Sequence, residues 1–330
     1  MHLIFKKLSY RHKNNKFLYY SFNFIRLLFP TIFFRARLHK KLATIKNYDL
    51  EYIKKRVNYY NKLAGTLTLH TRKNSLSDFK LKRKFKVYFF DSQEYTRYFS
   101  AKLRINFLFG DITYVPEEPT IIKSRPIQGD NSNSAILKLN KVRHFIFTND
   151  KKEFEKKLDM LVGRGRIVRT HRVRFYEMYF GHPLCNLGQT NKGSNTDHWR
   201  KEKLTLDEQL NYKFILCLEG NDVASNLKWV MSSNSLAVMP KPTFETWFME
   251  GTLIPDYHYV SLKDDYSDLE EKLRYYITHT DEALKILANA HEYVNQFKHT
   301  KREDLISLLV LQKYFYKTGQ LSVHDESLFN

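Results

Sequence analysis

The sequence has little of what marks a disulfide-stabilised, zinc-binding or membrane-spanning protein. Only two of its 330 residues are cysteine. Cys185 and Cys217 both lie in apolar stretches, which argues against a disulfide scaffold or a cysteine zinc site and favours a reducing compartment. No run of 18 apolar residues occurs, and the nearest candidate, residues 22–34, contains polar residues and a proline and precedes no small-residue cleavage site. We therefore expect neither a signal peptide nor a spanning helix.

The chain also lacks the common nucleotide-binding motifs. It contains no Gly-x-Gly-x-x-Gly fingerprint and no Walker loop. Its composition is nevertheless that of a folded protein, because 42% of the residues are hydrophobic and 15% are aromatic. A length of 330 residues allows two domains with full cores.

Positive charge is in excess and is unevenly distributed. The formal net charge is +20, and residues 1–60 hold 14 Lys and Arg against Asp49 and Glu51. Aromatic residues alternate with these cations, for example at Phe22, Phe29 and Phe33. This pattern suits an anionic membrane surface, nucleic acid, or a helical segment with a solvated basic face. Charge by itself leaves these three interpretations open.

Residues 214–262 have the pattern of an alternating α/β domain. The short apolar run 214–218 ends at Gly220 and predicts a buried strand, residues 226–231 predict a helix, and residues 236–239 and 257–262 predict two more strands. Residues 244–249 are expected to form a short helix. Such alternation indicates a parallel sheet, whose ligands bind beyond the carboxyl ends of the strands. The loop from Gly220 to Lys228 lies at such an end and would suit a phosphate, although a plain structural loop fits the pattern equally well.

The N-terminal half predicts shorter elements around a polar loop. Strands are expected at 84–90, 103–109, 143–147 and 158–162, and a helix at 170–180. The loop 115–134 carries a dense polar group, consisting of Lys123, Ser124, Arg125, Asp130 and Asn131. Loops held on a scaffold often carry site residues, so we treat this group as a candidate site, although a surface loop without function is the alternative.

Arginines follow the predicted strand at 158–162. Arg164 and Arg166 are separated by Gly165, and a guanidinium fixed at a sheet edge could bind a phosphate through two hydrogen bonds or pair with a neighbouring acid. At the C-terminal end, Ser267 and Glu270 predict a capping box that opens a helix, and apolar stripes predict two further helices, to which we assign no chemistry.

Ordered landmarks over residues 107–320 resemble glycosyltransferase family 90, in particular its bacterial lipopolysaccharide-modifying branch, the lipopolysaccharide A proteins. The landmarks are Gly110-Asp111, Lys123-Ser124-Arg125-Pro126, Gly129-Asp130-Asn131, Arg143-His144-Phe145, Arg164-Gly165, His182-Pro183-Leu184-Cys185, Tyr212-Lys213, Gly220-Asn221, residues 224–229, residues 245–248, His258-Tyr259-Val260 and residues 265–269. The first hundred residues are not covered by the resemblance.

The resemblance implies an α/β fold of the GT-B type, with two Rossmann-like domains facing a cleft. We therefore expect a basic, helical N-terminal segment (1–65), an acceptor domain (66–155), a nucleotide-sugar domain (156–300) and a C-terminal helix and tail (301–330). The family is inverting and needs no metal. The sequence has no Asp-x-Asp motif, so cationic side chains and helix ends are expected to hold the diphosphate.

The resemblance also assigns roles to particular residues. Asp111 best matches the catalytic base that accepts the proton of the acceptor hydroxyl, with Asp130 as the alternative. Where eukaryotic relatives place an arginine, this chain has Asn226, so Lys228 could supply the charge or the donor contacts could differ. Lys123, Ser124 and Arg125 are expected to bind the acceptor. The expected nucleotide-sugar contacts are Arg164, Gly165, Arg166, Arg172, Gly220, Asn221, Asp222, Ser225, Asn226, Lys228 and Glu245.

The sequence as a whole predicts a metal-independent, inverting glycosyltransferase without a cofactor. Its donor would be a nucleotide sugar, a hexose or pentose linked to UDP, and its acceptor lipopolysaccharide core or a related surface glycan. The basic N-terminal segment would hold it on the inner face of the inner membrane as a peripheral cytoplasmic protein. A capsule- or protein-directed transferase of the same fold, or a non-catalytic glycan- or nucleic-acid-binding protein, is the alternative.

Overall fold

The computed structural model describes residues 14–65, 69, 75–193, 196–323 and 325–329. The chain divides into two compact units, each discontinuous in sequence. Unit 1 consists of 1–15, 143–242 and 251–296, and unit 2 of 16–142, 243–250 and 297–330. The C-terminal helix thus belongs to the same unit as the N-terminal helices. Each unit therefore combines stretches of chain that are far apart in sequence.

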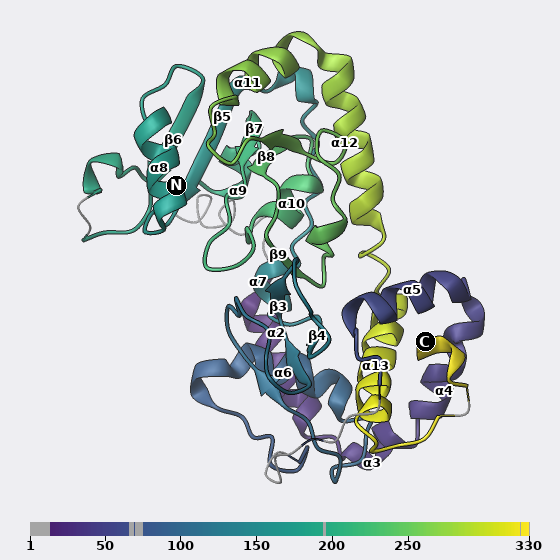
Figure 1. The fold of residues 1–330 in the computed structure, drawn as a ribbon. Helices are drawn as coiled ribbons and strands as arrows, with labels where there is room; N and C mark the ends of the chain where they lie inside the picture. The colour runs from purple at the N-terminus through teal and green to yellow at the C-terminus, as the bar shows by residue number, and fades with distance from the viewer. Residues whose placement is uncertain (1–13, 66–68, 70–74, 194–195, 324, 330) are drawn as a thin grey trace. The chain divides into compact units, whose positions relative to one another are not determined.

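Unit 1 is built on one parallel sheet with strand order β10-β8-β7-β5-β6 (Figure 1). Its strands are β5 (Leu158–Gly165), β6 (Cys185–Gln189), β7 (Tyr212–Leu216), β8 (Leu236–Pro240) and β10 (Val260–Leu262). Its helices are η3 (Phe154–Lys156), α8 (Thr170–Tyr179), η4 (Asp197–Trp199), α9 (Leu206–Gln209), α10 (Leu227–Met231), α11 (Leu269–Thr278) and α12 (Thr280–Asn295). This is a doubly wound order, in which the chain moves outward from β5 to β6, then reverses to β7 on the other side of β5.

The sheet is covered on both faces because consecutive residues of its central strands are apolar and point to opposite faces. Leu161, Phe214 and Val238 belong to a buried cluster that includes side chains of α8, α11 and α12. Their neighbours in sequence, such as Val162 and Ile215, are fully buried on the opposite face, and α10 packs against β8. The expected strands at 158–162, 214–218, 236–239 and 257–262 are confirmed with small shifts of their ends, and α8 confirms the helix expected at 170–180.

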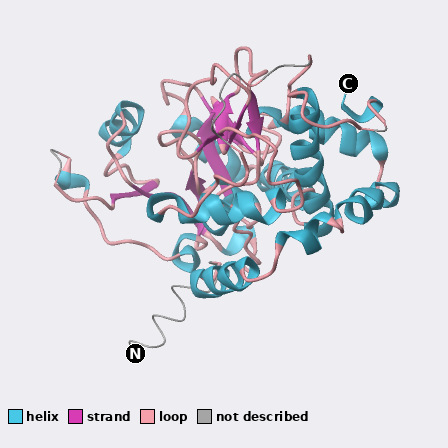
Figure 2. Ribbon diagram, turned by 90° about the horizontal axis from the view of Figure 1, so that it is seen from below, coloured by secondary structure: helices cyan, strands magenta, loops and turns pink. Residues whose placement is uncertain are grey.

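Unit 2 combines helices with a short parallel sheet of order β1-β2-β4 and an antiparallel ribbon of β3 and β9. Its strands are β1 (Phe107–Leu108), β2 (Thr120–Ile122), β3 (Ser124–Pro126), β4 (Ser134–Ile136) and β9 (Phe244–Thr246). Its helices are α2 (Lys16–Leu27), α3 (Thr31–Arg35), α4 (Leu38–Leu42), η1 (Ala43–Asn47), α5 (Leu50–Tyr60), η2 (Arg83–Phe85), α6 (Lys86–Thr96), α13 (Thr300–Lys317) and η6 (Ser327–Phe329). Figure 2 distinguishes the helices from the strands by colour.

Long-range contacts hold the N-terminal and C-terminal segments of unit 2 together. On α5, the guanidinium of Arg56 contacts Oε2 of Glu303 on α13 at 3.0 Å, and both side chains are almost completely buried. The indole Nε1 of Trp247 donates to the same carboxylate at 2.6 Å. The Tyr60 ring stacks on Trp247 with centroids 3.9 Å apart. The carboxylate therefore joins three segments that are distant in sequence.

Several expected elements were wrong. Residues 84–90 were predicted as a strand but enter helix α6, whose buried residues follow helical spacing at Phe89, Ser92 and Thr96. Residues 143–147 were predicted as a strand, but α7 (Lys141–His144) and a loop occupy that place. Of residues 103–109 only 107–108 form a strand.

Two predictions near the C-terminal part of the chain also failed. Residues 244–249 were expected to be helical, but 244–246 form β9, because the backbone pairs with β3, a partner 120 residues earlier. The predicted capping box at Ser267 is absent, since Asp268 is the N-cap and the Ser267 hydroxyl donates to Asp265 instead. At 244–246 pairing with a distant strand outweighed the helical pattern. At Ser267 the hydroxyl was taken by an acceptor two residues earlier.

Candidate functional site

The carboxyl ends of β5 and β7 form the switch point of the unit 1 sheet. The chain leaves β5 toward β6 on one side and reaches β7 on the other, so the loops that follow these two strands diverge. A crevice of this kind is the usual ligand site of open parallel sheets. The loop after β5 runs from Arg166 to Arg169 and the loop after β7 from Cys217 to Asn226. Most of the predicted nucleotide-sugar residues lie in or beside these loops.

Arg172, in the first turn of α8, connects the two loops. Its Nε donates to the carbonyl of Glu219 at 2.7 Å, its Nη2 to that of Leu218 at 2.7 Å and its Nη1 to that of Arg166 at 2.9 Å. Burial lowers the pKa of the guanidinium. Because these partners are neutral carbonyls, they fix the position of the cation without neutralising its charge, which leaves a positive potential at the switch point.

Two neighbours of Arg172 that the sequence analysis did not single out complete this cluster. The Arg169 guanidinium donates through Nε to Oδ1 of Asn221 at 2.9 Å and also contacts that oxygen through Nη2. The His171 ring Nε2 lies 2.8 Å from the carbonyl oxygen of Glu219. The sequence contains a signal for both residues, because 164–174 contains five arginines and one histidine and follows a predicted strand.

The other predicted residues after β5 have different surroundings. Arg164 is directed at the outer strand β6, where its Nη1 donates to the Asn186 carbonyl at 2.7 Å and its Nη2 to the Asn186 side chain at 2.9 Å. It also donates to the Glu202 carbonyl. Arg166 is exposed, and Gly165 lies close to Arg172. Arg164 therefore braces the edge of the sheet in the described structure, and its predicted contact with a nucleotide stays a prediction.

The loop after β7 is anchored from within. The Asn226 Nδ2 donates to the Leu216 carbonyl at 2.9 Å and so ties the start of α10 to the end of β7. Asp222 is buried and its carbonyl accepts from the Gly220 N–H, while Ser225 is half-buried and Asn221 is exposed. Lys228 is fully buried, with its ammonium 5.7 Å from the centre of the Phe145 ring. Because α10 has only five residues, its dipole adds little, and the arginines are the stronger source of positive potential here.

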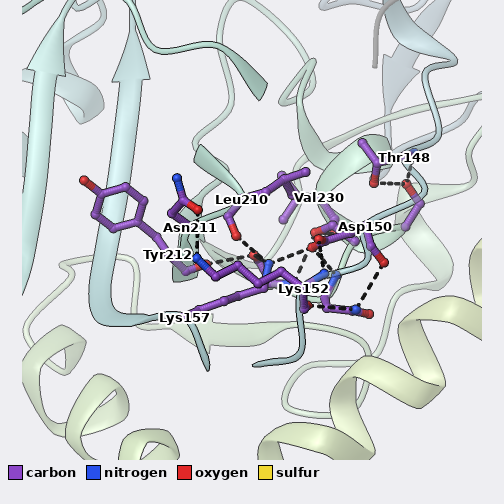
Figure 3. Close-up of polar contacts among 12 residues, drawn as sticks. Thr148, Asp150, Lys152, Lys157, Leu210, Asn211, Tyr212 and Val230 are labelled. Atoms are coloured by element: carbon purple, nitrogen blue, oxygen red, sulfur yellow. Dashed lines mark hydrogen bonds and ion pairs between the residues drawn. The ribbon is translucent and has the colours of Figure 1, made fainter. Parts of the chain in front are cut away.

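The amino ends of the same strands carry a separate polar cluster, shown in Figure 3. The buried Lys157 ammonium contacts Asp150 Oδ2 at 2.6 Å, the Leu210 carbonyl at 2.7 Å and the Ser235 hydroxyl at 2.8 Å. Burial lowers the pKa of Lys157, against the raising effect of Asp150. This network lies at the edge opposite the switch point and fixes how the chain enters β5, so we assign it to stability.

Unit 2 has its own charged pair at the carboxyl edge of a parallel sheet. Asp111 follows β1, and Lys123 follows β2 directly. The Lys123 ammonium contacts Asp111 Oδ1 at 2.6 Å; the lysine side chain is 2% exposed and the aspartate side chain 33% exposed. A buried cation therefore holds one oxygen of a partly exposed carboxylate. Gly110, just before it, has a φ of +119°, a conformation that favours glycine and turns the chain there.

Asp130, the alternative base, lies in an exposed turn between β3 and β4. Its Oδ1 accepts from the Ser132 backbone N–H at 2.8 Å, and this hydrogen bond lowers the pKa of the carboxyl group. Each candidate base therefore has a stabilising partner, the Ser132 N–H for Asp130 and the Lys123 ammonium for Asp111. The choice of Asp111 over Asp130 stays a prediction.

Arg125 and Glu245, predicted as acceptor and nucleotide contacts respectively, are partners of each other. They are opposite residues of β3 and β9, and Arg125 Nε donates to Glu245 Oε1 at 2.8 Å. Arg125 also donates to the carbonyls of Tyr59, Tyr60 and Ser134. Both charged side chains are almost completely buried, and Ser124 is buried beside them. This environment favours a structural role, and the predicted ligand contacts remain untested.

No group of three or more His, Cys, Asp or Glu that could hold a metal ion occurs among the residues that the structure describes. The two cysteines are buried and free. Burial raises the pKa of the Cys185 thiol to about 12 and that of Cys217 further. Neither thiol is suited to act as a nucleophile at neutral pH.

Together these features define an α/β protein with a cationic switch point in one unit and a lysine-paired carboxylate in the other. Comparison with known proteins then places it more closely. The family model of glycosyl transferase family 90 matches residues 149–315. The chain is 42% identical over 263 residues to O-glucosyltransferase LpsA of Dichelobacter nodosus, which covers 80% of this chain and 82% of that protein. It is also 28% identical over 137 residues to uncharacterized protein 179R of Invertebrate iridescent virus 6, covering 38% of this chain and 11% of the viral protein.

The chain belongs to glycosyl transferase family 90, and it is a glycosyltransferase. The resemblance found in the sequence is confirmed. The family match starts at residue 149, so it includes the cationic switch point, whereas the carboxylate of Asp111 lies outside it.

Proposed function

We propose that the protein is an inverting, metal-independent glycosyltransferase of the GT-B type that transfers glucose, or another hexose or a pentose, from a UDP-sugar to lipopolysaccharide core or a related surface glycan. The similarity to a bacterial O-glucosyltransferase supports glucose as the first donor to test and lipopolysaccharide as the acceptor. A capsule- or protein-directed transferase would use the same donor chemistry and differ only in the acceptor.

The observation that carries the donor part of the proposal is the position of Arg172. A diphosphate at the switch point would meet a cation whose partners are neutral carbonyls, with Arg169 on the same helix start beside it. As the bond from the anomeric carbon to the diphosphate breaks, negative charge grows on the leaving oxygen. A positive charge that is already fixed in place stabilises that charge without rearrangement.

In the same mechanism Asp111 accepts the proton of the acceptor hydroxyl. The hydroxyl oxygen forms the new bond to the anomeric carbon, the nucleotide leaves with the electrons of the old bond, and the configuration inverts. Lys123 contacts one carboxylate oxygen at 2.6 Å and so orients the group. Lys123 is thus a positioning residue in this proposal. Arg125 lies on β3, the strand that follows Lys123, and holds it against β9.

The donor proposal is tested by thermal unfolding of the full chain with UDP, other nucleotides and a panel of UDP-sugars, each with and without EDTA. A ligand that binds only the folded state raises the unfolding temperature. A selective stabilisation by UDP that EDTA leaves unchanged is expected. Stabilisation that disappears with EDTA would contradict metal independence, and no response to any nucleotide would favour a non-catalytic binding protein.

We also propose that α2 and α3 bind the anionic surface of the inner membrane from the cytoplasmic side. Helix α2 packs on α6 through polar groups and aromatic rings: the Tyr19 hydroxyl donates to Asp91 at 2.7 Å, Arg26 contacts Glu94 at 3.1 Å, and the Phe24 ring lies against Phe90. Other apolar side chains face outward, with Phe22 63% exposed on the helix and Leu28, just after it, 80% exposed. A soluble helix ordinarily shows the opposite arrangement. The other exposed large apolar residues of this surface are Phe17, Leu18, Phe24, Ile25, Phe29, Ile32 and Phe33.

Charge complementarity favours a lipid surface as the occupant of this apolar face. Lys16, Arg35, Arg37, Lys40 and Lys41 lie on the same helices or follow them. A cation near an anionic surface contributes about 1 kcal/mol, and burial of apolar side chains adds to it. Within the described residues no single helix is long and apolar enough to cross a membrane, and the pair Lys16–Leu27 and Thr31–Asn47, which passes together, is bent by 95°. This geometry suits helices that lie in the interface.

Flotation of the full chain with vesicles tests the membrane proposal. We expect binding to vesicles of phosphatidylcholine with phosphatidylglycerol, weaker binding to phosphatidylcholine alone, and release by high salt. Phe22→Ser/Leu28→Ser should lower the bound fraction several-fold, whereas Ile254→Ser/Leu284→Ser, which removes two exposed apolar side chains elsewhere, should not. Equal binding of both double variants would overturn the role of α2, and retention in high salt would indicate a hydrophobic anchor.

A further inference from the structure

Unit 2 contains an aromatic cavity that the proposed mechanism does not use. It has a volume of about 390 Å³ and is lined by parts of η2, α6 and β1 and by residues next to them in sequence, including Phe79, Lys80, Lys82, Phe85 and Phe109. A volume of roughly 300 Å³ or more is typical of small-ligand sites. The cavity is partly open, because Phe79, Phe85 and Phe109 are only half-buried.

The aromatic rings form one continuous wall. The Phe79 and Phe107 rings stack with centroids 4.5 Å apart, and Phe109 lies 5.3 Å from Phe107 and 5.8 Å from Phe85. Tyr88 extends the wall, 5.1 Å from Phe109. A pyranose ring has a face of C–H bonds with partial positive charge, which packs on the electron-rich face of an aromatic ring. Half-exposed rings around a cavity therefore suit a sugar.

Two cations, Lys80 and Lys82, line the cavity together with the carboxylate of Asp78. Residues 80–86 contain Lys80, Lys82, Arg83, Lys84 and Lys86 with no acidic residue among them, and Asp78 is the nearest acid in sequence. The carboxylate of Asp78 accepts from the Ser75 hydroxyl and backbone. Among the ion pairs between described residues, none involves these five cations. Such a segment attracts phosphate or carboxylate groups.

The cavity is close in sequence to the proposed base. Phe109 lines it, and Asp111 follows two residues later, after the turn at Gly110. A glycan seated on the rings would thus be bound by the same β1 loop that holds the carboxylate. Sugar recognition at Phe109 and proton removal at Asp111 would then both take place in unit 2.

We infer that this cavity is the acceptor subsite and that it binds an anionic oligosaccharide, one whose sugars carry phosphate or carboxylate groups. The inference rests on the proposed function and adds to it the chemical class of the acceptor and the residues that select it. The aromatic wall supplies contact with the sugar ring, and residues 80–86 supply the preference for charge. Lys123, Ser124 and Arg125, the acceptor residues expected from sequence, are not among the residues that line it.

The test measures acceptor binding and donor binding separately. Binding of a phosphorylated core oligosaccharide and of its dephosphorylated form to the full chain is measured by titration calorimetry without any donor, and UDP binding is measured alongside. We expect the phosphorylated form to bind at least tenfold more tightly, with a difference that shrinks as salt is raised. Equal affinity for both forms would overturn the charge preference.

Three variants identify the site. Phe85→Ala and Lys80→Ala/Lys82→Ala should each weaken oligosaccharide binding at least tenfold and leave UDP affinity unchanged, and Phe85→Tyr, which keeps the ring, should restore it. Lys151→Ala/Lys301→Ala removes the same charge from exposed positions elsewhere and should leave oligosaccharide binding unchanged. Unchanged binding in the cavity variants would overturn the site.

Two other outcomes separate this inference from the proposed function. If UDP fails to bind while the oligosaccharide binds through Phe85, the donor proposal fails and the subsite stands. If a single-stranded oligonucleotide binds as tightly as the oligosaccharide and through the same residues, the cavity recognises stacked bases and phosphates, and the inference is wrong.

Discussion

The ammonium of Lys123 lies 2.6 Å from a carboxylate oxygen of Asp111, and the two residues follow neighbouring strands of the unit 2 sheet. A buried lysine thus fixes one carboxylate oxygen of a partly exposed aspartate. The relationship gives the candidate base a defined orientation. It also brings together two landmarks that are twelve residues apart in sequence.

Replacement of Asp111 by Asn should reduce kcat by about 10³-fold, because loss of a general base typically costs 10²–10⁴-fold. The amide oxygen still accepts from Lys123, so the fold and the affinity for UDP should change little. Steady-state transfer assays and UDP titration measure the two effects. Asp130→Asn is the matched control and should retain most activity; an inactive Asp130→Asn beside an active Asp111→Asn would reverse the assignment.

Replacement of Arg172 by Met should weaken UDP binding tenfold or more. The variant removes a charge held between the loops after β5 and β7, and hydrogen bonds to charged groups contribute roughly 1.5–3 kcal/mol. Calorimetric titration with UDP measures the loss of affinity, and thermal unfolding without ligand shows whether the variant remains stably folded. Arg174→Met, an exposed arginine of the same helix, is the control. Unchanged affinity in Arg172→Met would exclude this arginine from the donor site.

Replacement of Glu245 by Gln should lower the free energy of unfolding by about 3–5 kcal/mol, because it leaves the buried Arg125 charge without its carboxylate. Urea unfolding measures the loss. In the folded variant, UDP affinity should match that of the wild type if the residue is structural. A variant of normal stability with weakened UDP binding would instead support the predicted nucleotide contact.

The stability of the protein should rise between pH 8 and about 10.5. Burial lowers the pKa of Lys313, on α13, to about 8, and the charge of Lys317 adds to the effect. In this range the unfolded chain binds more protons at this lysine than the folded chain does, so its contribution to the free energy of unfolding increases with pH. Below pH 8 the full cost of burying the ammonium is present.

Replacement of Lys313 by Met should remove that rise and stabilise the protein at pH 7 by about 1–3 kcal/mol, after loss of the hydrogen bond to Asn58. Urea unfolding at several pH values between 7 and 10.5 provides the comparison. Lys301→Met, exposed on the same helix, should keep the wild-type pH dependence. If the free energy of unfolding of the variant rises with pH as steeply as that of the wild type, another group causes the rise.

Local pattern was a good guide where the composition of a segment alone marks it as buried. The buried strands β5, β7 and β8 were predicted because an apolar run between turn residues has few other ways to bury both faces. Strand β6 was missed, since Cys185–Gln189 contains asparagine, glycine and glutamine and gains its strand form only by pairing with β5. Strand β9 was mistaken for a helix because its partner, β3, lies far away in sequence.

The sequence by itself determined that the chain is a folded, basic α/β protein, and its ordered landmarks identified the family, because apolar periodicity and motif order survive without coordinates. Only the tertiary structure decided what each charged side chain does. Arg125, Arg164 and Arg172 are the same residue type, yet their contacts differ. Arg125 pairs with Glu245 inside unit 2, Arg164 binds the neighbouring strand β6, and Arg172 connects the two loops of the switch point. The reason is physical: a guanidinium binds whichever acceptors the fold brings within about 3 Å, and those acceptors lie up to 120 residues away.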